Sequence, residues 1–306
     1  MSAARPTLHL VDASVYVFRA YYSVPPEMHD ASGQPVHAVY GFLGFLLSLL
    51  DQGRPSHLAI AFDESLTTSY RNRIYPEYKA NRELPPPDLD HQFRWCRKLV
   101  ALMGLHALAH GEFEADDLIG SVLARGRAHG YRAVIVTADK DLSQLIEADD
   151  QIWDFARNQR YGGDGVHERM GVHPVQVADY LALTGDAIDN IPGVPGIGAK
   201  TAAALLAHFG TLDALLARLD ELPYLRLRGA ASLAAKLREH RELALLSRQL
   251  TRISLEAPCP SHPDELVPKS PDVAALDAAM DELGFGPLTR RRVREYTARF
   301  APAVPA

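Results

Sequence analysis

Nine acidic side chains in this 306-residue sequence have the types and spacing of metal ligands. Most of them follow an apolar run, as in LHLVDAS, HLAIAFDES and AVIVTADKD, where a buried strand would end. The carboxyl ends of parallel strands form the edge at which α/β proteins bind ligands, so we expect these acids to converge. The set comprises Asp12, Asp63, Glu114, Asp116, Asp117, Asp139, Asp141, Asp186 and Asp189.

Carboxylates gathered at one edge repel one another and take up protons unless cations hold them ionised. Divalent metal ions do so most directly, because Mg²⁺ prefers oxygen ligands and keeps several waters. Of two ions a few ångströms apart, one lowers the pKa of an attacking water while the other stabilises the leaving oxygen. The acids therefore predict a metal-dependent enzyme that hydrolyses phosphodiesters.

Each acidic group also has a simpler interpretation. The EADD sequence at 114–117 opens a predicted helix, where acids favour the helix dipole without any metal. In TADKD, a helix N-cap explains one of Asp139 and Asp141 but not both, since they face the same side of an extended stretch. Asp12 and Asp63, each closing a strand, fit caps or turn residues. One metal site explains all four groups together.

Composition places the chain among ordinary globular proteins, with 47% hydrophobic and 23% charged residues. This length suits one large domain or two modest ones. The longest apolar stretch, 41–50, is too short to cross a bilayer and contains Gly44, and no signal peptide precedes Asp12. Cys96 and Cys259 lie far apart without a CxxC pattern, which disfavours zinc or a disulfide framework. We expect a cytoplasmic protein without a membrane partner.

The net charge of -6, from 32 basic and 38 acidic residues, argues at first against a nucleic-acid partner. The charges are segregated along the chain, however. Residues 71–98 carry seven basic and four acidic residues, and residues 226–252 carry seven basic and two acidic ones. Either cluster alone is equally consistent with a solvated helix face.

The basic segment SYRNRIYPEYKANR at 69–82 also carries three tyrosines. Cations contact phosphates and aromatic rings stack on bases, so this composition suits a strand of nucleic acid. The prolines at 85–87 stop any helix and predict a loop or arch over the sheet edge. Lys79 and Arg82, if helical, would point toward one phosphate. The alternative is an exposed tyrosine-rich surface loop.

A glycine-rich segment, NIPGVPGIGAKTA at 190–202, lies between two predicted helices. Gly193, Gly196 and Gly198 allow a tight hairpin with exposed backbone amides, and Lys200 lies in the first turn of the next helix. Such a hairpin offers N–H groups to a phosphate without reading any base. Dinucleotide-binding loops share this glycine spacing, but the position between helices disfavours that reading.

The order of the elements predicts an α/β domain followed by a helical one. Strand-like runs at 7–11, 57–62, 105–109 and 133–137 alternate with helical patterns at 36–50, 88–104 and 114–129. This alternation predicts a mostly parallel sheet covered by helices. A shorter run at 151–156 adds an edge strand, and from His173 onward the patterns are helical.

Together these motifs resemble the 5' nuclease family, which comprises the N-terminal 5'-3' exonuclease domain of bacterial DNA polymerase I, its free-standing bacterial and phage relatives, and eukaryotic flap endonucleases. The matching motifs, in the family's order over residues 8 to about 210, are LVDASVYVFRAYYSVP, AIAFDES, YKANR, FEADD, TADKDLSQL and GDAIDNIPGVPGIGAKTA. The resemblance implies a PIN-like nuclease domain at 1–172 with a helical arch at about 68–90. It further implies a helix-hairpin-helix (H3TH) domain at 173–258 that binds duplex DNA, and a C-terminal extension with terminal helices at 259–306.

The resemblance also implies roles for individual residues. The first metal site would comprise Asp12, Asp63, Glu114, Asp116 and Asp117, and the second Asp139, Asp141, Asp186 and Asp189. Lys79 and Arg82 would contact the scissile phosphate. The expected DNA contacts are Arg19, Arg71, Tyr78, Gly193, Gly196, Gly198 and Lys200. A potassium ion would be held by the backbone carbonyls of Leu183, Thr184, Pro192, Val194 and Ile197. Ala13 stands where the family often has glycine.

We therefore expect a 5'-3' exonuclease and 5'-flap endonuclease that uses two Mg²⁺ or Mn²⁺ ions and leaves 5' phosphates. It would act on DNA junctions in Okazaki fragment processing, RNA primer removal and DNA repair. The expected partners are DNA and a DNA polymerase, with the chain itself monomeric. No polymerase domain follows, so the chain, if complete, would act alone. The alternatives are a non-catalytic junction-binding module and a PIN-type ribonuclease, which would not need the hairpin domain.

Overall fold

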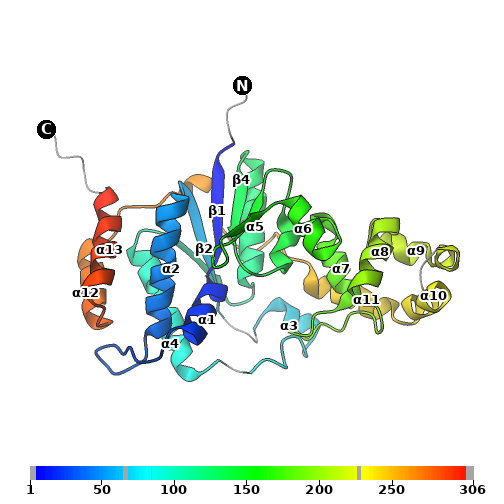
Figure 1. The fold of residues 1–306 in the computed structure, drawn as a ribbon, viewed down its shortest axis with the longest axis horizontal. Coiled ribbons are helices and arrows are strands. Elements are labelled where there is room, and N and C mark those ends of the chain that lie inside the picture. Colours follow the sequence, from blue (N-terminus) through cyan, green and yellow to red (C-terminus); the bar gives the residue numbers. More distant parts are fainter. Residues whose placement is uncertain (1–4, 65–67, 84, 226–228, 301–306) are drawn as a thin grey trace.

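A computed structural model of the chain describes residues 5–64, 68–83, 85–225 and 229–300 (Figure 1). Ser65 of the AIAFDES motif, residue 84 of the expected arch, and Arg226 and Arg228 of the second basic cluster lie outside the described residues. No helix of the described ranges combines the length and the apolar character that crossing a membrane requires.

A six-stranded sheet forms the centre of the N-terminal half. The strands are β1 (Thr7–Asp12), β2 (His57–Asp63), β3 (His106–His110), β4 (Arg132–Val136), β5 (Gln151–Asp154) and β6 (Gln159–Tyr161). Their order is β3-β2-β1-β4-β5-β6, and every pairing is parallel except that of β5 with β6. The sheet thus confirms the predicted mostly parallel architecture. The predicted edge strand at 151–156 forms as β5, but it is not the edge, because β6 returns antiparallel beside it.

Strand register brings the first acids to one edge. Asp12 pairs with Ala61 of β2, two residues before Asp63. On the other side of β1, Val11 pairs with Val136, which directly precedes Thr137. The ends of β1, β2 and β4 therefore meet at the carboxyl edge of the sheet, as the apolar runs predict.

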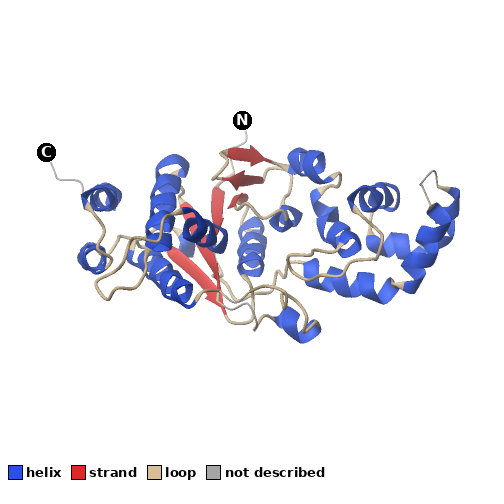
Figure 2. Cartoon of the chain, turned by 60° about the horizontal axis from the view of Figure 1, so that its bottom comes forward, coloured by secondary structure: helices blue, strands red, loops and turns tan. Residues whose placement is uncertain are grey.

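Helices cover both faces of the sheet (Figure 2), which explains why its strands read as continuous apolar runs. One face packs against α1 (Ala13–Ser23), α2 (His37–Gly53) and α4 (Pro87–Leu102), and the other against α5 (Ala115–Ala128). Side chains alternate between the two cores, with Val11 in the first and Leu8 and Leu10 in the second.

The helical region has a hydrophobic core of its own. It comprises α6 (Gly163–Met170), α7 (Val177–Thr184), α8 (Ala199–Phe209), α9 (Leu212–Ala217), α10 (Ala230–Glu239) and α11 (Arg241–Thr251), with short 3-10 helices at Pro174–Gln176 and Leu219–Tyr224. The glycine-rich hairpin joins α7 to α8. This arrangement confirms the predicted all-helical second part, although the domain limits 1–172, 173–258 and 259–306 stay predictions.

The C-terminal segment returns to the α/β part. It contains 3-10 turns at Pro263–Leu266 and Ala298–Phe300 and two helices, α12 (Val273–Glu282) and α13 (Pro287–Thr297). These helices pack on the side of α2 and α4 and extend the first core (Figure 1). Arg299 bonds Leu50 O near the end of α2, and Arg5 bonds Tyr131 O just before β4. Both ends of the described chain thus lie on the side of the sheet opposite Asp12.

The expected arch is mostly non-helical. Helix α3 (Tyr70–Ile74) is short, and turns follow it as far as Arg82. Lys79 has φ 58°, a left-handed conformation, so Lys79 and Arg82 do not share a helical face. A short 3-10 helix at Asp141–Leu145 follows β4.

Candidate active site

A cavity of about 350 Å³ lies at the carboxyl edge of the sheet and contains seven of the nine predicted acids. These are Asp12, Asp63, Glu114, Asp116, Asp139, Asp141 and Asp189. The rest of the wall includes Ser14, Val15, Phe18, Tyr78, Lys79, Arg82, Ala115, Ile191, Leu250 and Thr251. Sheet, expected arch, hairpin loop and the end of α11 therefore all contribute to one cavity.

Asp12 and Asp63 end neighbouring strands and differ in their surroundings. Burial, together with the nearby charges of Asp63 and Asp139, raises the pKa of Asp12 to about 8. Thr137 Oγ1 donates a hydrogen bond of 2.9 Å to Asp12 Oδ2. Asp63 Oδ1 accepts one of 2.8 Å from the backbone N–H of Ala115, at the start of α5. Asp12 thus keeps its proton near neutral pH unless a cation neutralises the cavity.

Glu114 stands at the N-terminus of α5 and is buried. Its Oε2 lies 2.9 Å from Lys79 Nζ and accepts a 3.0 Å hydrogen bond from the Tyr78 hydroxyl. Burial alone would raise the pKa of Glu114, but the charges of Lys79 and Arg71 outweigh it and hold the pKa below its usual range. Its other oxygen, Oε1, is buried without a hydrogen-bond partner in the described part of the chain.

Asp117 lies behind the cavity. Its side chain is 0% exposed, and its two oxygens accept from Arg71 at 2.7 and 2.9 Å. Oδ1 also accepts from Ser254 N at 2.7 Å, and Oδ2 from Glu114 N at 3.2 Å. With both oxygens engaged in this way and turned away from the cavity, Asp117 does not fit its predicted place in the first metal site. The neighbouring Asp116 does face the cavity.

Arg71 and Tyr78 are not placed to meet DNA. Arg71 is 1% exposed, and its Nε donates to Leu250 O at 2.8 Å. Tyr78 is 3% exposed, and its hydroxyl is bonded to Glu114. The expected DNA contacts at these two positions therefore do not fit. The Arg71 guanidinium faces the protein interior, and the Tyr78 hydroxyl is bonded to Glu114, although Tyr78 lines the cavity. The sequence shows the charge and the ring of these residues but not their burial.

The loop after β4 brings Asp139 and Asp141 to the cavity. The backbone N–H of Asp139 donates to Thr137 Oγ1, and that of Asp141 donates to Asp139 Oδ1, both at 2.9 Å. Burial and the charge of Asp139 raise the pKa of Asp141 to about 8. Asp141 Oδ1, like Glu114 Oε1, is a buried oxygen without a hydrogen-bond partner among the residues that the structure describes, although Lys140 Nζ lies 4.0 Å from it.

The two acids of the hairpin loop have different surroundings. Asp189 faces the cavity, pairs with Arg82 and lies 4.0 Å from Lys79 Nζ. Asp186 does not line it; this acid binds Lys140 Nζ at 2.7 Å and accepts from Ile188 N at 2.8 Å. Lys79 and Arg82, which the sequence places over the acids, therefore both reach them.

The donor set fits divalent metal ions. In this arrangement no three Asp, Glu, His or Cys side chains of the described ranges converge closely enough to hold one ion. Glu114 Oε1 and Asp141 Oδ1, two buried oxygens without a hydrogen-bond partner in the described ranges, nevertheless fit a bound cation, because buried carboxylate oxygens usually have partners. Raised pKa values at Asp12 and Asp141 show the same deficit of positive charge. Oxygen-only ligands are those that Mg²⁺ and Mn²⁺ prefer.

The glycine hairpin shows which of its predicted contacts are accessible. Gly196, Gly198 and Lys200 are exposed, and α8 begins directly after Gly198. Gly193 is buried, and its N–H donates to Ser247 Oγ at 3.1 Å, so it does not offer this amide to a phosphate. Its φ of 62° and a Cβ that would lie 2.3 Å from Gly185 N both require glycine. The glycine there shapes the hairpin.

The expected potassium ligands lie on the same hairpin. Leu183 O already accepts from Val194 N at 2.9 Å, and Val194 O from Ile197 N at 3.0 Å. Each carbonyl keeps a second lone pair for an ion. Arg19, the remaining predicted DNA contact, is exposed on α1 beside a small cavity of about 200 Å³ that includes Tyr16 and Phe45.

Several residues at the site were not predicted. Thr137 bonds Asp12 and Asp139, and its position at the end of β4, just before the acids, was a usable signal. Phe18 and Ser14 line the cavity from α1. Leu250 and Thr251 close it from the end of α11, and nothing in the local sequence there indicates this contact.

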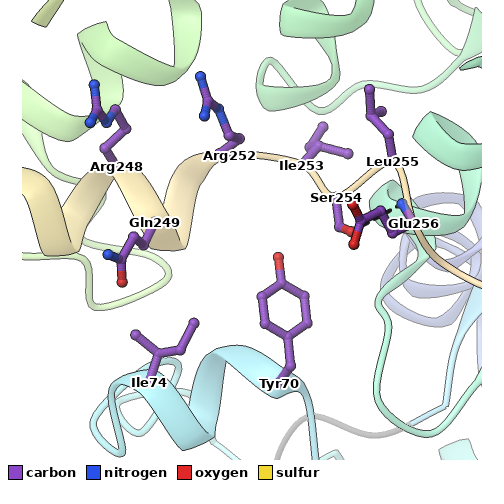
Figure 3. A pocket seen from close by; sticks show the side chains of 9 residues that line it. All are labelled: Tyr70, Ile74, Arg248, Gln249, Arg252, Ile253, Ser254, Leu255 and Glu256. Carbon is purple, nitrogen blue, oxygen red and sulfur yellow. Dashed lines mark hydrogen bonds between the residues drawn. The ribbon is translucent and has the colours of Figure 1, made fainter. Parts of the chain in front are cut away.

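A larger cavity of about 690 Å³ lies between α3 and the end of α11 with the segment that follows it. Figure 3 shows Tyr70 and Ile74 of α3 facing Gln249 and Ser254 across it. Glu256 is the one acid among its lining residues. The acid chemistry is therefore in the smaller cavity.

Comparison with known proteins agrees with this geometry. Residues 7–171 match the family model of the 5'-3' exonuclease N-terminal resolvase-like domain, and residues 172–274 match that of the 5'-3' exonuclease C-terminal SAM fold. The chain belongs to the 5'-3' exonuclease family. The expected family is thereby confirmed. The expected class of enzyme, a nuclease and therefore a hydrolase, is confirmed with it. The predicted fold class is confirmed as well.

The chain is also similar to parts of longer polymerases. The chain is 43% identical over 280 residues to DNA polymerase I of Pseudomonas aeruginosa, covering 91% of this chain and 30% of that protein. It is 37% identical over 282 residues to DNA polymerase I of Bacillus caldotenax, covering 91% of this chain and 31% of that protein. The chain thus spans about a third of the length of these relatives.

Solved structures show the same fold. The T5 D15 protein co-crystallised with metal ions superposes with a TM-score of 0.64 at 18% identity, covering 96% of this chain and 97% of that one. The catalytic core of Rad2 in complex with DNA substrate gives a TM-score of 0.64 at 15% identity, covering 97% and 93%. At such identities the comparison concerns the fold alone.

Proposed function

We propose that this protein is a structure-specific 5' nuclease that trims 5' ends and cuts 5' flaps where single strands join a duplex. The observation that carries the proposal is the convergence of seven carboxylates and the two cations of Lys79 and Arg82 on one cavity. The nuclease family and DNA-bound structural relatives support it. The substrate we propose is DNA, with a 5' phosphate left on the shortened strand.

The acids that line the cavity would hold two divalent ions, Mg²⁺ or Mn²⁺. Asp12, Asp63, Glu114 and Asp116 would serve one, and Asp139, Asp141 and Asp189 the other, partly through water. When bound, the ions would lower the pKa of the attacking water and stabilise the leaving oxygen. A T5 5'-exonuclease structure with bound zinc supports divalent metal ions at this fold.

The remaining side chains organise the site. Asp117 fixes Arg71, and Asp186 fixes Lys140, so these two acids support the cavity from outside it. Lys79 and Arg82 would bind the scissile phosphate and share in neutralising its charge in the transition state. Water oxygen bonds to phosphorus as the bond to the 3' oxygen breaks, which yields a 5' phosphate and a 3' hydroxyl.

Duplex DNA would bind along the hairpin between α7 and α8. The exposed Gly196, Gly198 and Lys200 supply backbone and side-chain donors to phosphates. A potassium ion on the hairpin carbonyls would add one more positive charge. We further propose that the protein works as a monomer in the cytoplasm, alongside a DNA polymerase, in RNA primer removal and repair. The polymerase relatives support this context.

The test is cleavage of a duplex with a labelled 5' flap by the purified chain, with Mg²⁺, Mn²⁺ or EDTA. We expect flap release near the junction with either ion and none with EDTA. Asp139→Asn should bind the substrate and leave it uncut. An intact flap with both ions would overturn the proposal. Equal cleavage of RNA without a junction would instead favour a ribonuclease.

A further inference from the structure

The segment that carries Lys79 and Arg82 is fastened to the hairpin loop by backbone and amide hydrogen bonds. Lys79 N donates to Asp189 O at 3.0 Å. Asn190 Nδ2 donates to Glu77 O at 2.7 Å, and Asn81 Nδ2 donates to Ala187 O at 2.7 Å. The two asparagines thus bond across the same contact in opposite directions, one from each segment.

The backbone at this contact is unusual on both sides. Lys79 has φ 58° and Asn190 has φ 56°, and both are left-handed conformations. Asparagine tolerates this region, whereas lysine seldom adopts it. Such a residue keeps its conformation only when its surroundings hold it there, and strained backbone of this kind occurs at functional sites.

The held conformation directs both cations into the cavity. From this backbone the Lys79 ammonium lies 2.9 Å from Glu114 Oε2, and Arg82 reaches Asp189. Neither asparagine amide lines the cavity, so neither is placed to touch a reacting atom. Their bonds end on main-chain carbonyls of the facing segment, which makes their effect one of position.

We propose that Asn190, assisted by Asn81, is a positioning residue that presents Lys79 and Arg82 to the scissile phosphate. The proposal rests on the nuclease function proposed above and deepens it. Asn190 fixes the start of the segment through Glu77 O, while Asn81 fixes its end through Ala187 O. Lys79, between the two, is held in its left-handed conformation.

The variants separate the effect of the Asn190 amide from the effect of its backbone conformation. Asn190→Gly keeps access to the left-handed conformation and removes the amide, with some added backbone freedom. Asn158→Gly is the matched control, because Asn158 also has a positive φ, of 50°, in the exposed turn between β5 and β6. Asn81→Ala removes the second bond from a residue outside the acid motifs. Single-turnover rate and DNA affinity are measured for each.

We expect Asn190→Gly and Asn81→Ala each to slow the single-turnover rate about five-fold, the effect of one net hydrogen bond, with DNA affinity unchanged. Asn158→Gly should match the wild type. In a background that carries both Lys79→Ala and Arg82→Ala, Asn190→Gly should cause little further loss, because both residues that it positions are gone. Independent, multiplying losses would overturn the proposal. A changed affinity for Mn²⁺ in Asn190→Gly would also overturn the proposal, because it would mean that Asn190 acts through Asp189.

Hydrogen exchange separates failure of this inference from failure of the nuclease function. The Lys79 amide, bonded to Asp189 O, should exchange faster in Asn190→Gly than in the wild type or in Asn158→Gly. This holds whether or not the chain cuts DNA. Unchanged exchange in residues 77–82 would refute the positioning role, even if the wild type cleaves flaps.

Discussion

At the scale of single residues, the nine acids differ in whether other protein groups already bind their carboxylate oxygens. Asp117 and Asp186 form short ion pairs with Arg71 and Lys140. Glu114 and Asp141 each keep a buried oxygen without a hydrogen-bond partner in the described ranges. The sequence presents all nine acids alike, because a carboxylate's type and spacing do not show which cation it meets after folding.

The proton on Asp12 gives a pH prediction. Its pKa in the folded protein is about 8, above the usual 3.8 that applies when unfolded. Between these values the unfolded chain has lost the proton and the folded one has not, so stability falls as pH rises from about 4 to about 8. In EDTA, Asp12→Asn should therefore raise the melting temperature at pH 8 and reduce its dependence on pH.

The measurement is thermal unfolding from pH 5 to 8 without divalent ions. Asp164→Asn, which changes an exposed acid on α6, should keep the wild-type pH slope. If Asp12→Asn keeps that slope too, the carboxyl does not hold a proton in the folded protein. Added Mg²⁺ should oppose the wild-type loss at pH 8, because ion binding favours the ionised form.

Lys79 gives a kinetic prediction. Lys79→Ala should lower the single-turnover cleavage rate about 100-fold, the cost of removing one preorganised donor to transition-state charge. Affinity for flap DNA should change far less, because this cation acts mainly on charge that develops in the reaction. The control is Lys98→Ala, whose half-exposed ammonium lies over Trp95 away from the cavity. Equal losses of rate and affinity would contradict the role of Lys79.

At the scale of elements, α3 connects α5 of the α/β part with the end of α11 through Arg71. Arg71 on its inner face bonds Asp117 of α5, Leu250 O of α11 and Arg252 O beyond it. One guanidinium therefore fixes three elements that meet behind the cavity. Its planar fork suits this task, which lysine cannot perform in the same way.

Removing the Arg71 guanidinium should strongly destabilise the folded protein. Arg71→Met leaves the buried carboxylate of Asp117 unpaired, and we expect it to lower the free energy of unfolding by about 3–5 kcal/mol. Arg73→Met, on the exposed face of the same helix, should lower it far less, because it breaks only a solvent-exposed ion pair with Glu112. Urea unfolding of both variants measures the difference. Similar losses of stability in the two variants would mean that Arg71 does not hold these elements together as its contacts indicate.

The sequence predicted those elements whose signal is local. The acids that end β1 and β2 and those that follow β4 lie where the apolar runs place them, because register follows from strands buried on both faces. The burial of Arg71 and Tyr78 was not predictable, since it depends on the end of α11, some 180 residues away for Arg71. The left-handed backbone of Lys79 likewise depends on a bond to Asp189 O, in another element.

At the scale of the whole molecule, hydrogen bonds join the helical region to the α/β part. Gln144 bonds Thr251 O and Ile253 N, each at 3.0 Å. Ser254 N donates to Asp117, and Thr251 lines the cavity itself. The site is therefore complete only when the α/β part and the helical region are both folded and joined.

We expect the protein to unfold in one cooperative transition. Trp95 and Trp153 both lie in the α/β core, so their fluorescence reports on that part alone. Far-UV circular dichroism reports on all helices, including those of the helical region. The two urea curves should coincide for the wild type. Separate midpoints would show that the two parts fold independently and that the connecting bonds contribute little.

The described ends of the chain have a practical consequence. Arg5 and Phe300 both lie on the side of the sheet away from the acids, beside the starts of the strands. A tag, dye or surface anchor attached at either end would therefore leave the approach to the cavity open. Immobilised molecules could then be observed cutting individual substrates without the attachment chemistry blocking them.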